Sequence, residues 1–191
     1  GNDGGAADAG NADGGDNGGG AVELTQTETV DATDMGGSLS ISYPEGWFVT
    51  GEAGGFLISN SEEALASSGP QDLDEIPAGT VVVSVTILPG DMVGAMGVEG
   101  DVTPKAVLDL FSGFMGGEDM PEFGDVEELT INGHAAARVT GSDDKMTATL
   151  YAIDNDGNFA FGMGATRPDE ADQHADVIQA IISSASFTAS E

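Results

Sequence analysis

The chain offers few side chains for acid–base chemistry, since it contains two histidines and no cysteine. A catalytic triad needs a nucleophile, a base and a group that orients the base. His134 follows an Asn-Gly turn, where a solvent-facing or cross-strand position is expected. His174 lies four residues after Glu170 on a predicted helix, a spacing that would let both side chains share a metal, although a solvated helix flank is the simpler interpretation. The chain has neither a Gly-x-Ser-x-Gly elbow nor a phosphate-binding loop, so we predict that it is not an enzyme.

The segment Asp154–Asn158 places oxygen ligands at alternate positions, as calcium-binding loops do. An EF-hand loop has Gly at its sixth position and Glu at its twelfth, but here Gly157 is fourth and Ala165 is twelfth. A hairpin turn therefore explains the segment better, with a weak calcium site as the alternative and no other cofactor expected. Asp143 and Asp144 would contribute to that site if the two loops met. The candidate metal ligands are Asp154, Asp156 and Asn158.

An apolar segment that carries methionines, Asp91–Val98, lies between two predicted elements where a polar loop is expected. Methionine side chains adapt to different shapes and therefore suit surfaces that bind partners. The alternative is a short helix that folds back over the core. The candidate partner-binding residues, which include two from the later segment around Met115–Phe123, are Met92, Val93, Met96, Val98, Met120 and Phe123.

The charge balance excludes several functions. The 191 residues include 34 acidic and 4 basic side chains, which gives a formal net charge of −30. Without a basic patch the chain cannot replace the counterions of nucleic acid, and it is repelled by anionic lipid. An acidic surface of this kind favours solubility or life in salty water, and a cation-binding surface is the alternative. Self-repulsion should destabilise the fold at low ionic strength.

The composition divides the chain into two parts. Residues 1–20 contain only Gly, Ala, Asp and Asn, and residues 21–35 are rich in Thr and acids, so residues 1–35 are predicted to be a flexible linker. Residues 36–191 are predicted to form one folded domain. A spacer of this composition ahead of a cysteine-free acidic domain resembles the region that follows the lipidated cysteine of a lipoprotein. We therefore expect an extracytoplasmic protein whose only membrane attachment is a lipid anchor before Gly1.

The pattern of apolar residues predicts the elements that must position these groups. Residues 38–43 alternate and end at Pro-Glu-Gly, and Thr80–Leu88 is apolar on both faces, as in a central strand. Thr103–Met115 is predicted to be a helix with Thr103 as its N-cap and an apolar face that includes Phe114. The order of elements indicates an α+β fold with one antiparallel sheet and packed helices. The other predicted elements are hairpins over 47–59, 126–140 and 146–165, helices at 61–66 and 168–183, and a strand at 186–188.

Several of these motifs together resemble a known family. Tyr43-Pro-Glu-Gly-Trp47 is similar to the opening of PsbP-like domains, which share their fold with the Mog-type Ran-binding proteins. Later motifs follow in the family's order, namely a helix, a strand over Leu129–Arg138, a Tyr-bearing strand over Thr149–Ile153 and a terminal helix before Ser186-Phe187. The resemblance covers about residues 38–188 and implies an α/β/α sandwich with a non-catalytic binding or assembly role. No metal or chloride site of the family carries over.

The sequence therefore predicts a non-catalytic module that docks on a larger protein complex at the cell surface or in the periplasm. The alternative is a structural component of an extracellular array or filament, in which the partner is another copy of the chain.

Overall fold

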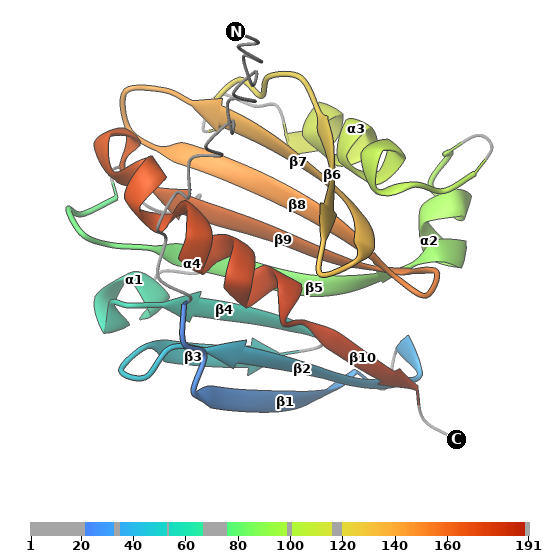
Figure 1. Ribbon diagram of the computed structural model, residues 1–191, viewed down its shortest axis with the longest axis horizontal. Helices are drawn as coiled ribbons and strands as arrows, with labels where there is room; N and C mark the ends of the chain where they lie inside the picture. The colour runs from blue at the N-terminus through green and yellow to red at the C-terminus, as the bar shows by residue number, and fades with distance from the viewer. Residues whose placement is uncertain are drawn as a thin grey trace, which may run out of the picture.

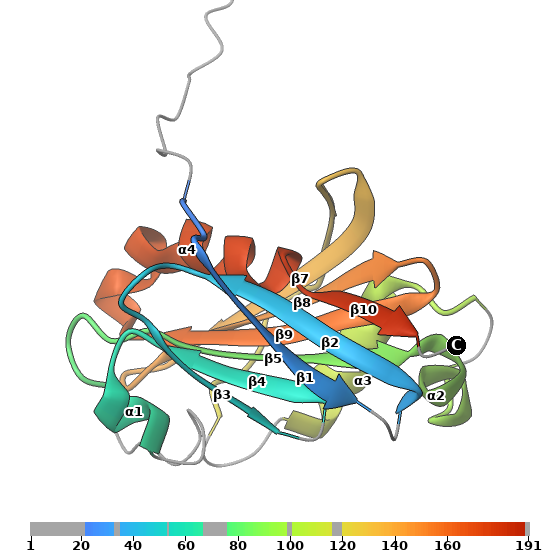
Figure 2. The same cartoon turned by 90° about the horizontal axis from the view of Figure 1, so that it is seen from below.

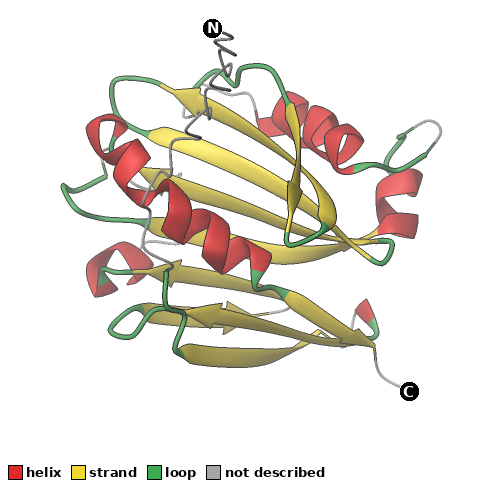
Figure 3. Cartoon of the chain, in the orientation of Figure 1, coloured by secondary structure: helices red, strands yellow, loops and turns green. Residues whose placement is uncertain are grey.

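The fold consists of two antiparallel sheets and a few helices (Figures 1 and 3). This is the α+β class that the sequence predicts, with a second, smaller sheet in addition. The structure is a computed structural model. It describes residues 22–32, 35–52, 54–66, 76–98, 101–115 and 120–189.

The larger sheet has seven strands in the order β3-β4-β5-β9-β8-β7-β6. All its neighbouring strands are antiparallel, and β5 pairs with β9 although about half the domain separates them in sequence. The prediction that residues 80–88 form a central strand is confirmed, but the prediction that both its faces are covered is wrong, because Val83, Val85 and Ile87 are buried whereas Ser84 and Thr86 on the other face are partly exposed. The strands are β3 (Phe48–Glu52), β4 (Gly55–Ser59), β5 (Val82–Pro89), β6 (Glu127–Ile131), β7 (His134–Ser142), β8 (Thr147–Asn155) and β9 (Asn158–Thr166).

The smaller sheet has three strands, β1 (Gln26–Ala32), β2 (Gly37–Tyr43) and β10 (Ser186–Ala189), in the order β1-β2-β10. The predicted domain boundary at residue 35 is therefore wrong, because β1 pairs with β2 along its whole length. Its threonines hydrogen-bond to serines across the sheet, with Thr29 Oγ1 lying 2.8 Å from Ser40 Oγ, and Val30 packs against the core. Residues 1–21 lie outside the described residues, so the linker remains a prediction for that segment.

The helices lie on both sides of the larger sheet. Figure 2 shows α4 on one side and α1, α2 and α3 on the other. Thr103 caps α3 as predicted, because its Oγ1 accepts a hydrogen bond from the Ala106 N–H at 3.2 Å. Phe114, predicted to lie on the buried face of α3, is 71% exposed, whereas Met115 packs against the core. The helical segments are α1 (Glu62–Ala66), α2 (Gly90–Ala95), α3 (Pro104–Met115), the 3-10 segment η3 (Pro168–Glu170) and α4 (Ala171–Ser183).

Two hydrophobic cores form on the two faces of the larger sheet. On one face, α4 packs beside the small sheet, and its Ile178 and Ile182 reach the backbone of β9 where Gly162 and Gly164 leave room for them. On the other face, α3 covers β6, β7 and β8, and its Val107 and Leu108 are fully buried. Helix α3 therefore does not cover the part of the sheet that β3, β4 and β5 form.

Candidate binding site

A groove of about 480 Å³ lies on the part of the sheet that α3 does not cover. Ligand pockets typically have volumes of about 300–1,000 Å³, so this groove is large enough to take several side chains. Strand register explains the hollow. Leu57 on β4 is paired with Ser84 on β5, and the next row across the sheet is Gly55, Thr86 and Phe161. Because Gly55 has no side chain and Ser84 and Thr86 have small ones, a hollow forms between Leu57, Phe161 and α1.

One helix and one strand bound the described part of the groove. Leu65 and Ala66 of α1 form one wall. On the other side, the ring of Phe161 lines the groove and contacts the ring of Phe111 on α3, with the ring centroids 4.7 Å apart and tilted by 37°. Ser61 caps the N-terminus of α1, because its Oγ accepts a hydrogen bond from the N–H of Ala64 at 3.4 Å.

The described lining of the groove is mostly apolar and includes three hydroxyl side chains, those of Thr50, Ser84 and Thr86. Among the described residues that line it, none is acidic, basic or a histidine. The Thr86 hydroxyl donates a hydrogen bond to the Gly54 carbonyl at 3.0 Å, so it is already committed to holding β4 and β5 together. Leu57 and Phe161 provide an apolar floor. A surface of this kind binds apolar side chains but supplies no general acid or base.

The predicted methionine surface is partly wrong. Residues 90–95 form the helix α2, which is the alternative that the sequence left open, and its Val93 is completely buried in the core. Helical spacing places Met92 and Met96 together on the outside, where they are 48% and 45% exposed. The structure places α2 on the same side of the sheet as the groove (Figure 2). The remaining candidates pack against the core and are only partly exposed, namely Val98, Met120 and Phe123.

The segment Asp154–Asn158 is a hairpin turn between β8 and β9. Asp154 Oδ1 accepts the Gly157 N–H at 2.9 Å, and Asp156 and Gly157 both have positive φ, as a two-residue hairpin turn of this type requires. Asp143 lies in the turn before β8, at the opposite end of that nine-residue strand from Asp154. The idea that both loops share one cation is therefore wrong. Within the described ranges, no group of three His, Cys, Asp or Glu side chains could hold a metal ion, and the calcium site remains a prediction.

The two histidines lie too far apart to act together. His134 is exposed at the start of β7 and borders a hollow that Ser183 and Ser184, at the end of α4, also line. His174 lies in the first turns of α4. It is about 14 Å from Ser183 along the helix, since an α-helix rises about 1.5 Å per residue. Glu170, its proposed metal partner, accepts the Gly79 N–H at 2.7 Å.

The arginine of the Leu129–Arg138 segment lies on the other face of the sheet. Arg138 is paired across the strands with Tyr151, and its Nε donates to Glu127 Oε2 at 2.8 Å. The hydrogen bond that Arg138 donates to Glu127 raises the pKa of the Arg138 guanidinium. Burial raises the pKa of the Tyr151 hydroxyl, while the nearby guanidinium opposes that shift. Arg138 and Tyr151 lie in the same row as Gly162, on the face that α4 covers, so they take no part in the groove.

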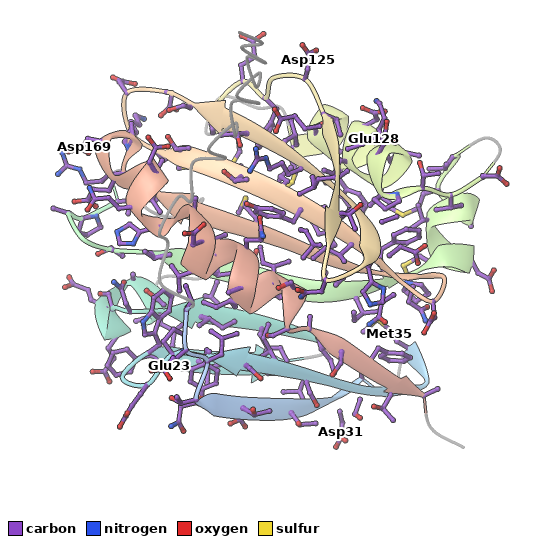
Figure 4. The ribbon with its side chains drawn as sticks, viewed as in Figure 1. Glu23, Asp31, Met35, Asp125, Glu128 and Asp169 are labelled. Atoms are coloured by element: carbon purple, nitrogen blue, oxygen red, sulfur yellow. The ribbon has the colours of Figure 1, made fainter. Side chains whose placement is uncertain are left out.

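Exposed acidic side chains lie on several parts of the fold. Figure 4 shows Glu23, Asp31, Asp125, Glu128 and Asp169 on separate parts of the fold, and all five are exposed. In the described part of the chain, three basic residues form ion pairs, namely Lys105 with Asp109, Arg138 with Glu127 and Arg167 with Asp169. None of the chain's four basic residues lines the groove. No helix of the described chain is long and apolar enough to cross a membrane.

Comparison with known proteins defines the class of fold. No protein-family model matches the chain, and no curated protein matches it by sequence. The solution structure of cyanobacterial PsbP (CyanoP) from Synechocystis sp. PCC 6803 matches 88% of this chain and 96% of its own, with a TM-score of 0.50 and 16% sequence identity. The chain therefore has a PsbP-like α+β fold, and the resemblance that Tyr43–Trp47 suggests is confirmed at the level of the fold.

Two further structures resemble the chain less closely. Mog1p, a Ran-binding protein of Saccharomyces cerevisiae, matches 86% of this chain and 96% of its own, with a TM-score of 0.45 and 10% identity. LpqN of Mycobacterium tuberculosis, which is involved in cell envelope biogenesis, matches 85% of this chain and 91% of its own, with a TM-score of 0.47 and 20% identity.

Proposed function

We propose that the protein is a non-catalytic binding module that docks on a larger protein complex outside the cytoplasm. The groove beside α1 carries this proposal, because it combines an apolar floor with a lining that holds no acid, base or histidine among the described residues. Exposed Met92 and Met96 of α2 add a separate apolar area on the same side of the sheet. Tethering by a lipid anchor is supported by the Gly-, Asp- and Asn-rich composition of residues 1–20.

Site-directed photo-crosslinking tests this function. Because the chain has no native cysteine, an introduced cysteine is the single site of labelling. Ser84→Cys places a single thiol on the floor of the groove, and Ala189→Cys places one on the exposed end of β10 in the small sheet. Each variant carries a thiol-linked photo-crosslinker and is added to envelope fractions of the source organism. The expected result is one crosslinked complex that forms from position 84 alone and disappears in the presence of excess unlabelled wild-type chain. Equal crosslinking from both positions, or none from position 84, would contradict the proposal.

A further inference from the structure

We infer that the groove beside α1 takes a short cationic segment of a partner protein, with apolar side chains inward and Lys or Arg side chains toward α1. This inference rests on the proposed binding function and names the chemistry of its partner. Three observations carry it, namely the apolar floor, one exposed carboxylate at the rim, that of Glu62, and the charge of the whole chain.

The floor determines what faces inward. Leu57 is half-buried and presents apolar surface to the groove, whereas Phe161, which packs against Phe111, is 9% exposed and adds only a small apolar area. Leu65 adds a third apolar side chain from the wall. Apolar side chains on a docking segment would remove this surface from water, which is the main source of affinity in recognition by a groove.

The rim determines what faces the edge of the groove. In a helix, residues three and four apart share a face, so Glu62 lies on the same face of α1 as Leu65 and Ala66. Glu62 is exposed, and it is one helical turn from the groove wall. A Lys or Arg of the bound segment could therefore approach this carboxylate while its neighbours fill the groove.

The net charge favours a cationic occupant of the groove over an anionic one. A chain of formal charge −30 repels a second copy of itself, and it repels nucleic acid and anionic lipid for the same reason. A cationic protein segment is attracted over the whole surface and would associate faster than a neutral one. The groove has no basic residue of its own chain that would oppose such a segment.

The test is a selection from a random library of displayed peptides, about 12 residues long, against the full chain at roughly physiological salt to suppress unspecific charge attraction. Peptides that also bind a blocked variant are removed. Ala66→Trp blocks the groove from its exposed wall, and Ser84→Tyr fills the floor, so the test does not depend on the folding of one variant. The expected result is a set of peptides that need the open groove and carry net positive charge with spaced apolar residues.

The role of the rim is tested with the best peptide and a matched pair of charge removals. Glu62→Gln should weaken binding about two- to fivefold, the range for one exposed ion pair. Asp31→Asn removes the same charge from the exposed edge of the small sheet and should change binding less than about twofold. Equal weakening by both variants would mean that only the overall charge matters and would overturn the inference.

The remaining outcomes separate this inference from the proposed function. Peptides that need the open groove but are neutral or acidic would overturn the cationic partner and leave the binding function in place. Copies of the chain that associate at moderate salt, and fail to do so with Ala66→Trp, would replace the cationic partner by a second copy. If no selected peptide depends on the open groove, the inference of a cationic segment is wrong. The crosslinking from position 84 decides independently whether the groove binds a protein.

Discussion

The approach of α4 to the larger sheet depends on two glycines of β9, and this is where the fold should be most sensitive to one added methyl group. A Cβ on Gly164 would collide with the side chain of Ile178, whose Cδ1 and Cγ1 would lie 2.8 and 2.9 Å away. A Cβ on Gly162 would meet three atoms of Ile182 at 2.7–2.9 Å. Because Gly164 has an ordinary extended backbone, Gly164→Ala adds this clash without adding backbone strain.

The expected size of the effect follows from two opposing terms. Overpacking a core costs about 1–3 kcal/mol, whereas replacing Gly by Ala in a strand recovers about 0.5–1 kcal/mol of conformational entropy. Gly164→Ala should therefore lower the free energy of unfolding by about 1–2 kcal/mol. Ile178→Ala alone should cost about 2–5 kcal/mol through the cavity that it leaves. In the double variant the new methyl group fills part of that cavity, so the combined loss should fall below the sum by about 1–3 kcal/mol.

Urea unfolding measures this cycle, with circular dichroism and the fluorescence of Trp47 as probes. Trp47 is the only tryptophan and packs against the same core as α4, so its signal reports the affected region. Gly113→Ala is the control, because Gly113 is exposed on α3 with open space around it, and the change should stabilise the protein by up to about 1 kcal/mol. A Gly164→Ala variant as stable as the wild type, or strictly additive losses in the double variant, would refute the packing argument.

Three further predictions concern charge and turns. Raising the salt concentration from about 50 to 500 mM should raise the melting temperature by screening the −30 charge, and an unchanged or lower value would contradict the self-repulsion argument. Burial raises the pKa of Tyr151 above its ordinary value of 10.0, so the stability that its neutral hydroxyl contributes is complete below about pH 10 and is lost as the pH rises further. Tyr151→Phe should flatten that loss of stability at high pH. A variant with the same pH profile as the wild type would contradict this explanation. If Asp156 belongs to a weak calcium site, millimolar calcium should stabilise the wild type more than Asp156→Asn, whereas equal responses would indicate screening alone.

Much of the fold could be predicted because it depends on local patterns. The alternation in residues 80–88, the cap at Thr103 and the Asn132-Gly133 turn each lie within a short stretch of chain. The structure confirms the strand, the cap and the turn, in which Asn132 and Gly133 have φ values of 53° and 86°. These features follow from backbone geometry and side-chain period, so neighbouring residues are enough to specify them.

The pairing of distant segments was harder to predict. The strand at Gln26–Ala32 has a polar sequence that resembles a linker, and it becomes ordered only because β2 supplies hydrogen-bond partners such as Ser40. Val93 looked like an exposed apolar residue, yet α2 turns it into the core. In both cases a partner from elsewhere in the chain decides the outcome, and such contacts have no local signal.

The sequence by itself determined the class of fold, the acidic character and the shortage of catalytic groups, because composition and short-range periodicity carry that information. Only the tertiary structure decided where a binding surface lies. The groove exists because strand register brings Gly55, Thr86 and Phe161 into one row and because α3 covers only the half of the sheet that β6, β7 and β8 form. Register and helix placement are set by packing between distant segments, and no stretch of the sequence contains them alone.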